Sequence, residues 1–214
     1  MAEPGRFITF EGGEGGGKST QILRLAASLK EAGLDVVTTR EPGGTEGAEA
    51  IRNLVTEGTT DRWSPLTETL LFLAAREDHV ARLIRPALAR GQWVLCDRFI
   101  DSTRVYQGIA GTLGLELIDR LHATIFDDLT PDLTLLLDVA VETGLARRRG
   151  TGEVNRFDQM QVDFHQTVRT GFLGLARSEP ARFSVVDAGL AEAAVHNVIQ
   201  HIVAERFGLP LGLT

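Results

Sequence analysis

A glycine-rich stretch near the N-terminus constrains the fold more than any other feature of this sequence. Residues 12–20 read GGEGGGKST and fit the pattern of Gly, four residues, Gly, Lys and Ser/Thr. An apolar run over residues 6–11 precedes the stretch, and a segment of helical periodicity over residues 18–32 follows it. In that context glycines let backbone N–H groups wrap phosphates, Lys18 adds a positive charge, and the Ser19 hydroxyl offers an oxygen to Mg²⁺. The stretch therefore predicts a strand, a phosphate-binding loop and a helix in succession; the alternative is a glycine-rich turn that only starts a helix.

Short apolar runs alternate with longer helical-period segments along the rest of the chain. The predicted strands are residues 6–11, 36–39, 93–97, 133–138 and 183–187, and the predicted helices are residues 18–32, 67–90, 159–177 and 191–207. Buried strands in this alternation form a parallel sheet that must be covered on both faces. We expect an α/β fold, a doubly wound five-stranded parallel sheet with helices on both faces, in one domain spanning residues 1–214.

Composition excludes several classes of protein. With 43% hydrophobic residues the chain is not disordered, and no apolar run approaches the roughly 18 residues of a membrane span. A single cysteine and an N-terminus without an export signal favour the cytoplasm. The net charge of −7 argues against a nucleic-acid binder, although arginines can still bind phosphates locally. Of the 22 basic residues only Lys18 and Lys30 are lysines, and Lys30 fits a solvated helix face.

The acidic residue that ends the third predicted strand helps to distinguish between the classes of nucleotide-binding protein. The strand predicted over residues 93–97 ends in Asp97, which places a carboxylate near the phosphates and Mg²⁺. Arg98 follows it, where a hydrolytic motor usually has an acid, and an arginine suits a phosphoryl group in transfer between two nucleotides. The chain contains neither the Asn-Lys-x-Asp motif that reads guanine nor a Leu-Ser-Gly-Gly motif. A kinase is favoured over a GTPase or a motor.

Several ordered motifs together resemble the thymidylate kinases of bacteria, which have the P-loop nucleotide kinase fold with a short lid. The matching motifs are FEGGEGGGKST at 10–20, TREPGGT at 39–45, LLFLAAR at 70–76, DRFIDST at 97–103, YQG at 106–108 and NRFD at 155–158. The resemblance implies a cytoplasmic homodimer that converts ATP and dTMP to ADP and dTDP with Mg²⁺ held by Ser19 and Asp97. The implied ATP site comprises Gly12, Gly13, Glu14, Gly15, Gly16, Gly17, Lys18, Ser19 and Thr20. Another nucleoside monophosphate kinase, or a P-loop ATPase acting as a partner-binding switch, are the alternatives.

The resemblance also implies a site for the base and sugar of dTMP. Phe72 is similar to a ring that stacks on thymine, and Arg76, one helical turn later, to an arginine that donates to a thymine carbonyl. Thr103 and Gln107 correspond to readers of the thymine edge, and Tyr106 to a residue that lines the sugar. The alternative for Phe72 is an ordinary core aromatic.

The implied phosphate contacts of dTMP combine arginines with two acids. Arg52 and Arg98 correspond to arginines that grip the monophosphate, a task for which a bidentate fork is well shaped. Glu14 resembles an acid that accepts from the deoxyribose 3′-hydroxyl, with a solvated loop acid as its alternative. Glu41 resembles an acid near the acceptor phosphate and Mg²⁺, with a turn residue as its alternative.

The family has variants that differ in the position of the catalytic cation. Gly15 stands where the eukaryotic type carries arginine, so another segment must supply that charge. The arginine-rich residues 147–156 resemble the bacterial lid, which closes over ATP, and we place the lid at about residues 147–157. The implied catalytic set is Lys18, Asp97, Arg98, Arg149 and Arg156. A solvated helix end is the alternative for any single lid arginine.

Overall fold

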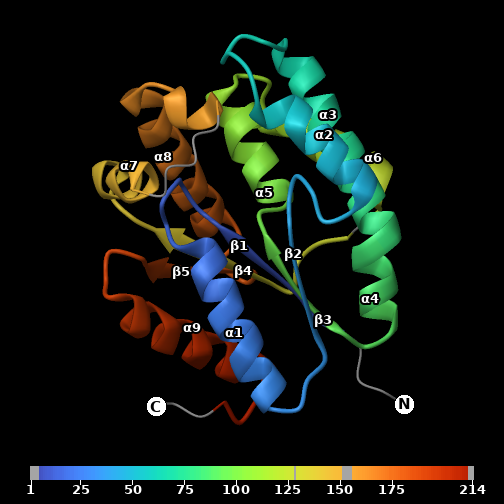
Figure 1. Cartoon of the computed structure of the whole chain (residues 1–214), viewed down its shortest axis with the longest axis vertical. Coiled ribbons are helices and arrows are strands. Elements are labelled where there is room, and N and C mark those ends of the chain that lie inside the picture. Colours follow the sequence, from blue (N-terminus) through green and yellow to red (C-terminus); the bar gives the residue numbers. More distant parts are fainter. Residues whose placement is uncertain (1–4, 128, 151–155, 212–214) are drawn as a thin grey trace.

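Five parallel strands form the single sheet of the described chain, as predicted. The computed structural model describes residues 5–127, 129–150 and 156–211. The strands are β1 (Phe7–Glu11), β2 (Val36–Arg40), β3 (Trp93–Asp97), β4 (Leu133–Asp138) and β5 (Phe183–Asp187). They lie in the order β2-β3-β1-β4-β5, and every neighbouring pair is parallel (Figure 1). All five strand predictions are confirmed, and the carboxyl ends of the strands share one edge of the sheet.

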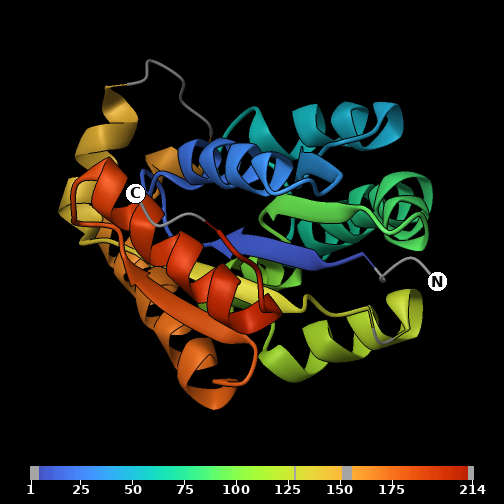
Figure 2. The same cartoon turned by 90° about the horizontal axis from the view of Figure 1, so that it is seen from below.

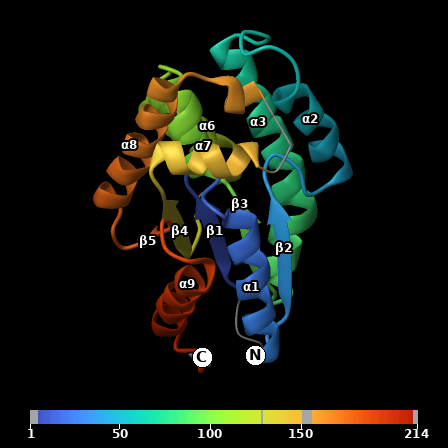
Figure 3. The ribbon, with the colours of Figure 1, turned by 60° about the vertical axis from the view of Figure 1, so that its left-hand side comes forward.

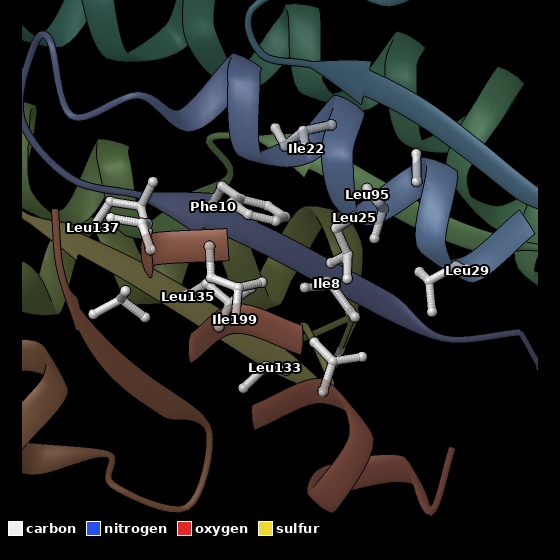
Figure 4. Close-up of a cluster of buried hydrophobic side chains, with 14 of the residues drawn as sticks. Ile8, Phe10, Ile22, Leu25, Leu29, Leu95, Leu133, Leu135, Leu137 and Ile199 are labelled. Atoms are coloured by element: carbon white, nitrogen blue, oxygen red, sulfur yellow. The ribbon is translucent and has the colours of Figure 1, made fainter. Parts of the chain in front are cut away.

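One face of the sheet packs against α1 (Lys18–Glu31) and α9 (Glu192–Phe207), which lie side by side (Figure 2). Ile8 and Phe10 of β1 both point to this face, because successive side chains of a strand point to opposite sides and these two residues are two positions apart. They meet Leu25 of α1 and Ile199 of α9 in a fully buried cluster (Figure 4). This packing fixes the direction of α1 and therefore the position of the loop that precedes it.

The other face is covered by several helices, among them α6 (Leu115–Phe126) and α8 (Val162–Ser178). Phe7, on the opposite side of β1 from Ile8, meets the Phe99 ring edge-on with centroids 4.9 Å apart. Helices thus cover both faces, which is the doubly wound arrangement expected from the sequence.

The helix predicted over residues 67–90 is interrupted. It consists of α3 (Pro65–His79), a π-helical turn η1 (Val80–Ile84) and α4 (Arg85–Ala89). Pro86 has no N–H with which to continue the helical ladder, so the helix adjusts its hydrogen bonding just before it. The other three predicted helices are found, with ends shifted by up to three residues.

The remaining helices were not predicted. They are α2 (Glu46–Thr56), α5 (Ile100–Thr103), η2 (Arg104–Ala110), α7 (Val141–Arg149) and η3 (Arg156–Gln159), in addition to α6. Figure 3 shows α7 crossing the carboxyl end of the sheet beside α8. This edge, where loops from several strands converge, is where an open α/β sheet binds ligands.

Candidate active site

The phosphate-binding loop joins β1 to α1 at the carboxyl edge of the sheet. Gly12, Gly15 and Gly17 have φ values of 133°, 67° and 81°, which side chains other than glycine rarely adopt. The Lys18 ammonium, 7% exposed, donates to the carbonyls of Gly12 at 3.2 Å and Gly13 at 2.8 Å. The residue that begins α1, Gly17, has no side chain with which to cap the helix, which leaves backbone N–H groups at this end for an anion.

A hydroxyl and a carboxylate meet beside this loop. Ser19 Oγ donates to Asp97 Oδ2 at 2.8 Å, which links the start of α1 to the end of β3. These are hard oxygen groups of the kind that Mg²⁺ prefers, together with water and substrate phosphates. Among the described residues, His, Cys, Asp and Glu side chains form no cluster of three or more that could hold a metal by themselves. The pair therefore suits a metal that arrives with a nucleotide.

A cavity of about 860 Å³ extends from the loop along the carboxyl edge of the sheet. Its lining includes most of the residues predicted for the site, which are Glu14, Gly15, Gly16, Gly17, Lys18, Ser19, Thr20, Glu41, Arg52, Phe72, Arg76, Asp97, Arg98, Thr103, Tyr106 and Gln107. The structure therefore gathers residues from the whole first half of the chain in one place.

Arg98 lines the cavity and is held there by neighbouring groups. Its φ of 70° is unusual for a residue with a side chain. Its Nη2 donates to Glu14 Oε1 at 2.8 Å, and the Tyr106 hydroxyl donates to the same oxygen at 3.0 Å. Burial would raise the pKa of Glu14, but the charges of Arg98 and Lys18 outweigh burial and lower this pKa to about 2. Glu14 is thus a carboxylate held by an arginine.

A second arginine, Arg76, also lines the cavity. Its Nε donates to Glu41 Oε2 at 2.6 Å, and its Nη2 donates to Thr103 Oγ1 at 2.9 Å. The second Glu41 oxygen lies 3.0 Å from His79 Nδ1. Buried Arg76 Nη1 has no hydrogen-bond partner among the described residues. An unpaired buried donor is costly, and this one belongs to a residue that lines the cavity.

Comparison with known proteins identifies the family to which this site belongs. The thymidylate kinase family model matches residues 10–199. The chain belongs to the thymidylate kinase family. It is 54% identical over 205 residues to a thymidylate kinase of Caulobacter vibrioides, covering 96% of this chain and 99% of that one. It is also 50% identical over 205 residues to a thymidylate kinase of Bradyrhizobium sp. strain ORS 278, covering 94% and 91%.

A solved structure agrees with the sequence comparisons. The crystal structure of thymidylate kinase from Ehrlichia chaffeensis matches with a TM-score of 0.75 at 36% identity, over 94% of this chain and 99% of that one. The resemblance inferred from the motifs is therefore confirmed, together with the P-loop nucleotide kinase fold. The chain is a kinase, and the reaction that gives the family its name converts dTMP to dTDP. Throughout the described part of the chain, none of the helices combines the length and the apolar character needed to cross a membrane.

The arginines predicted for the lid of this thymidylate kinase family member fall into two environments. Arg149, at the end of α7, is exposed and lies outside the cavity lining, whereas Arg147 and Arg148 belong to the lining. Arg156 is only 2% exposed and lies in η3. The rest of the predicted lid, residues 151–155, lies outside the described residues.

Three polar residues, Glu11, His79 and Glu68, support residues of the site through contacts that the motifs did not predict. Glu11 is fully buried, accepts from the Phe99 backbone N–H at 2.7 Å and from Ser102 Oγ at 2.6 Å, and so braces the chain just after Arg98. Burial and the nearby Asp101 raise the pKa of Glu11 to about 7. His79 supports Glu41, and Glu68 contacts Gln107. Two signals in the sequence pointed to Glu11, namely its place at the end of a buried strand and its place in the motif at residues 10–20.

An unpredicted aromatic residue, Phe157, also belongs to the cavity lining. The centroid of its ring lies 6.2 Å from that of Phe72 and 5.8 Å from that of Tyr106. Three rings from separate parts of the chain therefore form an apolar wall that can accommodate a flat base.

Proposed function

We propose that the chain transfers the γ-phosphoryl group of Mg-ATP, bound on the phosphate loop, to dTMP bound at the Arg76 end of the same cavity. The observation that carries the proposal is the continuity of this cavity of about 860 Å³, which joins Lys18 and Asp97 to Arg76 and Gln107. A hydrolytic ATPase needs room for water at the γ-phosphate, whereas a kinase needs an adjoining second site for the acceptor.

ATP would bind with its phosphates against the backbone N–H groups of Gly12–Thr20. Lys18 would give up its two carbonyl contacts for the phosphates, because a charged acceptor forms the stronger hydrogen bond. Ser19 and Asp97 would hold Mg²⁺, in part through water. When bound, this ion neutralises charge on the phosphates that react.

The acceptor dTMP would bind with its base near Phe72, Arg76, Thr103 and Gln107. The unpaired Arg76 Nη1 supports this orientation, since a thymine carbonyl supplies the acceptor that the buried donor lacks. Tyr106 and Glu14 would face the sugar.

The monophosphate of dTMP would bind to Arg52 and Arg98. The Nη1 of Arg52 donates to the Pro42 carbonyl at 2.7 Å, and both residues line the cavity. Arg98 Nη2 donates to Glu14 Oε1 at 2.8 Å and lies 3.4 Å from the Tyr106 hydroxyl. Two guanidinium groups suit a phosphate dianion better than two ammonium groups because each can donate in a fork.

Transfer needs no protein nucleophile, because an oxygen of the dTMP phosphate attacks the γ-phosphorus in line. The residues position the two nucleotides and neutralise charge in the transition state. Arg98 would lie between the two nucleotides. The arginines of α7 would approach the transferred group, since Arg147 and Arg148 line the cavity.

A test compares two lysine variants and one arginine variant. Release of ADP from Mg-ATP is measured with dTMP, dUMP, dCMP, dAMP, thymidine or no acceptor. We expect turnover with dTMP, and a loss of at least about 100-fold in kcat/KM for Lys18→Ala and for Arg98→Ala. Lys30→Ala, which changes an exposed lysine of the same helix, is the control. Activity confined to tubes without acceptor, or near-normal turnover by either active-site variant, would refute the proposal.

A cytoplasmic homodimer is also part of the proposal. Leu66 and Leu70 are 46% and 49% exposed on one face of α3, since residues four apart are neighbours on a helix. An apolar face of this kind suits a second copy of the chain. Sedimentation equilibrium should give about twice the 23.2 kDa of one chain, whereas the monomer mass would contradict the proposal.

A further inference from the structure

Glu68 connects a residue of the cavity with a residue outside it. This glutamate lies in α3, and 15% of its side chain is exposed. Its Oε1 accepts from Gln107 Nε2 at 2.7 Å, and its Oε2 is ion-paired with Arg156 Nη2. Gln107 belongs to the cavity lining, but neither Glu68 nor Arg156 does. Any effect of Glu68 on a ligand therefore acts through another side chain.

The contact between Glu68 and Gln107 fixes which end of the Gln107 amide faces the ligand. An ionised carboxylate only accepts hydrogen bonds, so it binds the NH₂ end of an amide and repels the carbonyl end. Gln107 is 4% exposed, which leaves its amide little room to point elsewhere. The Gln107 carbonyl oxygen, an acceptor, is consequently the end left for the cavity.

A hydrogen-bond acceptor at Gln107 and a donor at Arg76 together distinguish thymine from cytosine. Thymine has a carbonyl that accepts at C4 and an N–H that donates at N3, so it matches this pair. Cytosine has an amino group at C4 and a bare nitrogen at N3, so both contacts would be mismatched. A site built to hydrogen-bond one pattern strongly rejects the opposite pattern, because its buried groups are then left unpaired.

Arg156 holds Glu68 in place. Besides its ion pair, Arg156 donates from Nε to the Val55 carbonyl at 2.6 Å and from Nη1 to the Thr60 carbonyl at 3.3 Å. Its guanidinium carbon lies 4.6 Å from the centroid of the Phe157 ring, which is part of the cavity wall. A buried arginine with three such contacts is a poor candidate for reaching a transferred phosphate. Its geometry favours a supporting role.

We propose that Glu68 is a positioning residue for base selection: backed by Arg156, it orients the Gln107 amide so that an acceptor faces the base. The inference rests on the proposed role of Gln107 as a reader of the base. It assigns Glu68 no contact with either nucleotide.

The first test replaces the carboxylate by an amide. In Glu68→Gln the new side chain can donate or accept, so the Gln107 amide can turn over. Calorimetry then measures the Kd values of dTMP and dCMP, and nucleotide fluorescence measures the Kd of ATP without acceptor. We expect the preference for dTMP over dCMP to fall at least tenfold, while the affinity for ATP changes less than twofold. Glu77→Gln, which changes an exposed glutamate of the same helix, should leave all three Kd values unchanged.

A double-mutant cycle separates failure of this inference from failure of the proposed base site. If Glu68 acts through Gln107, Glu68→Gln has no further effect on the dTMP preference in a Gln107→Ala background. If Gln107→Ala keeps the full preference, the proposed role of Gln107 is wrong. If Gln107→Ala loses the preference but Glu68→Gln keeps it, the inference alone is wrong.

A further variant covers the case in which Glu68→Gln fails to fold because Arg156 is left unpaired. Glu68→Met combined with Arg156→Met removes both buried charges together, which proteins often tolerate. This variant should fold, bind ATP and lose the preference for dTMP over dCMP. A folded double variant with the preference intact would overturn the inference.

Discussion

The helix α7 contacts the phosphate loop at Gly144 and Gly15, and we expect a single added methyl group there to disturb catalysis. A Cβ on Gly144 would lie 2.3 Å from the Glu14 carbonyl oxygen. In the opposite direction, a Cβ on Gly15 would lie 2.0 Å from the Gly144 carbonyl oxygen. This contact also explains why an arginine at Gly15 is incompatible with the present position of α7.

The size of the effect of Gly144→Ala follows from this contact. A real Cβ stays at least 3.0 Å from such an atom, so α7 must retreat from the loop by about 0.7 Å. Misplacement of a catalytic group by about 1 Å costs about 100-fold, so we expect kcat/KM for ATP to fall about 10- to 100-fold. Overpacking costs about 1–3 kcal/mol, and alanine recovers about 1 kcal/mol of helix propensity. The net loss of at most about 2 kcal/mol leaves a typical domain folded.

The assay compares steady-state kinetics with thermal unfolding. Gly174→Ala is the matched control, because Gly174 also lies inside a helix but the nearest atom to an added Cβ is Arg177 Nη2 at 4.0 Å. The control should keep wild-type kcat/KM and gain stability. Wild-type kinetics in Gly144→Ala would refute the argument that this contact positions the arginines of α7. Loss of activity in both variants would show that the assay responds to helix rigidity instead.

Two further predictions concern acid groups beside Arg98. The pKa of Glu11 is raised from 4.5 to about 7, so between these pH values the folded protein holds a proton that the unfolded chain releases. The free energy of unfolding should therefore fall as the pH rises from about 5 to 7, by at most about 1.4 kcal/mol per pH unit. Urea titrations of Glu11→Gln should lack this part of the pH dependence, and an identical pH dependence in the variant would contradict the prediction. Chelation of Mg²⁺ should abolish turnover reversibly, and Asp97→Asn should need a higher Mg²⁺ concentration for half-maximal rate, whereas an unchanged Mg²⁺ requirement would remove Asp97 from the metal site.

The strands and the phosphate loop could be predicted because each is determined by residues that are adjacent in the sequence. Each strand is an apolar run with its own terminators, and the phosphate loop is a continuous pattern, so both were found. The break in the helix after His79 depends on Pro86, whereas the apolar spacing of a helix continues through this proline and does not show the break. Glu68 could not be found in this way, because its contact with Gln107 spans 39 residues of sequence and depends on how α3 and η2 pack.

The buried acids of this site determine what its basic and amide groups can offer to a ligand. Glu41 and Thr103 occupy two of the nitrogens of Arg76 and leave buried Nη1 unpaired among the described residues. Glu68 occupies the NH₂ end of Gln107 in the same manner. Each acid thereby occupies some of the hydrogen-bonding atoms of a neighbouring side chain and fixes which of the remaining atoms can face the substrate. Such preorganised groups need no rearrangement at the moment of reaction, which is where electrostatic catalysis gains its advantage over water. An acidic chain can therefore bind a polyanion with selectivity, because its acids are used to position its arginines.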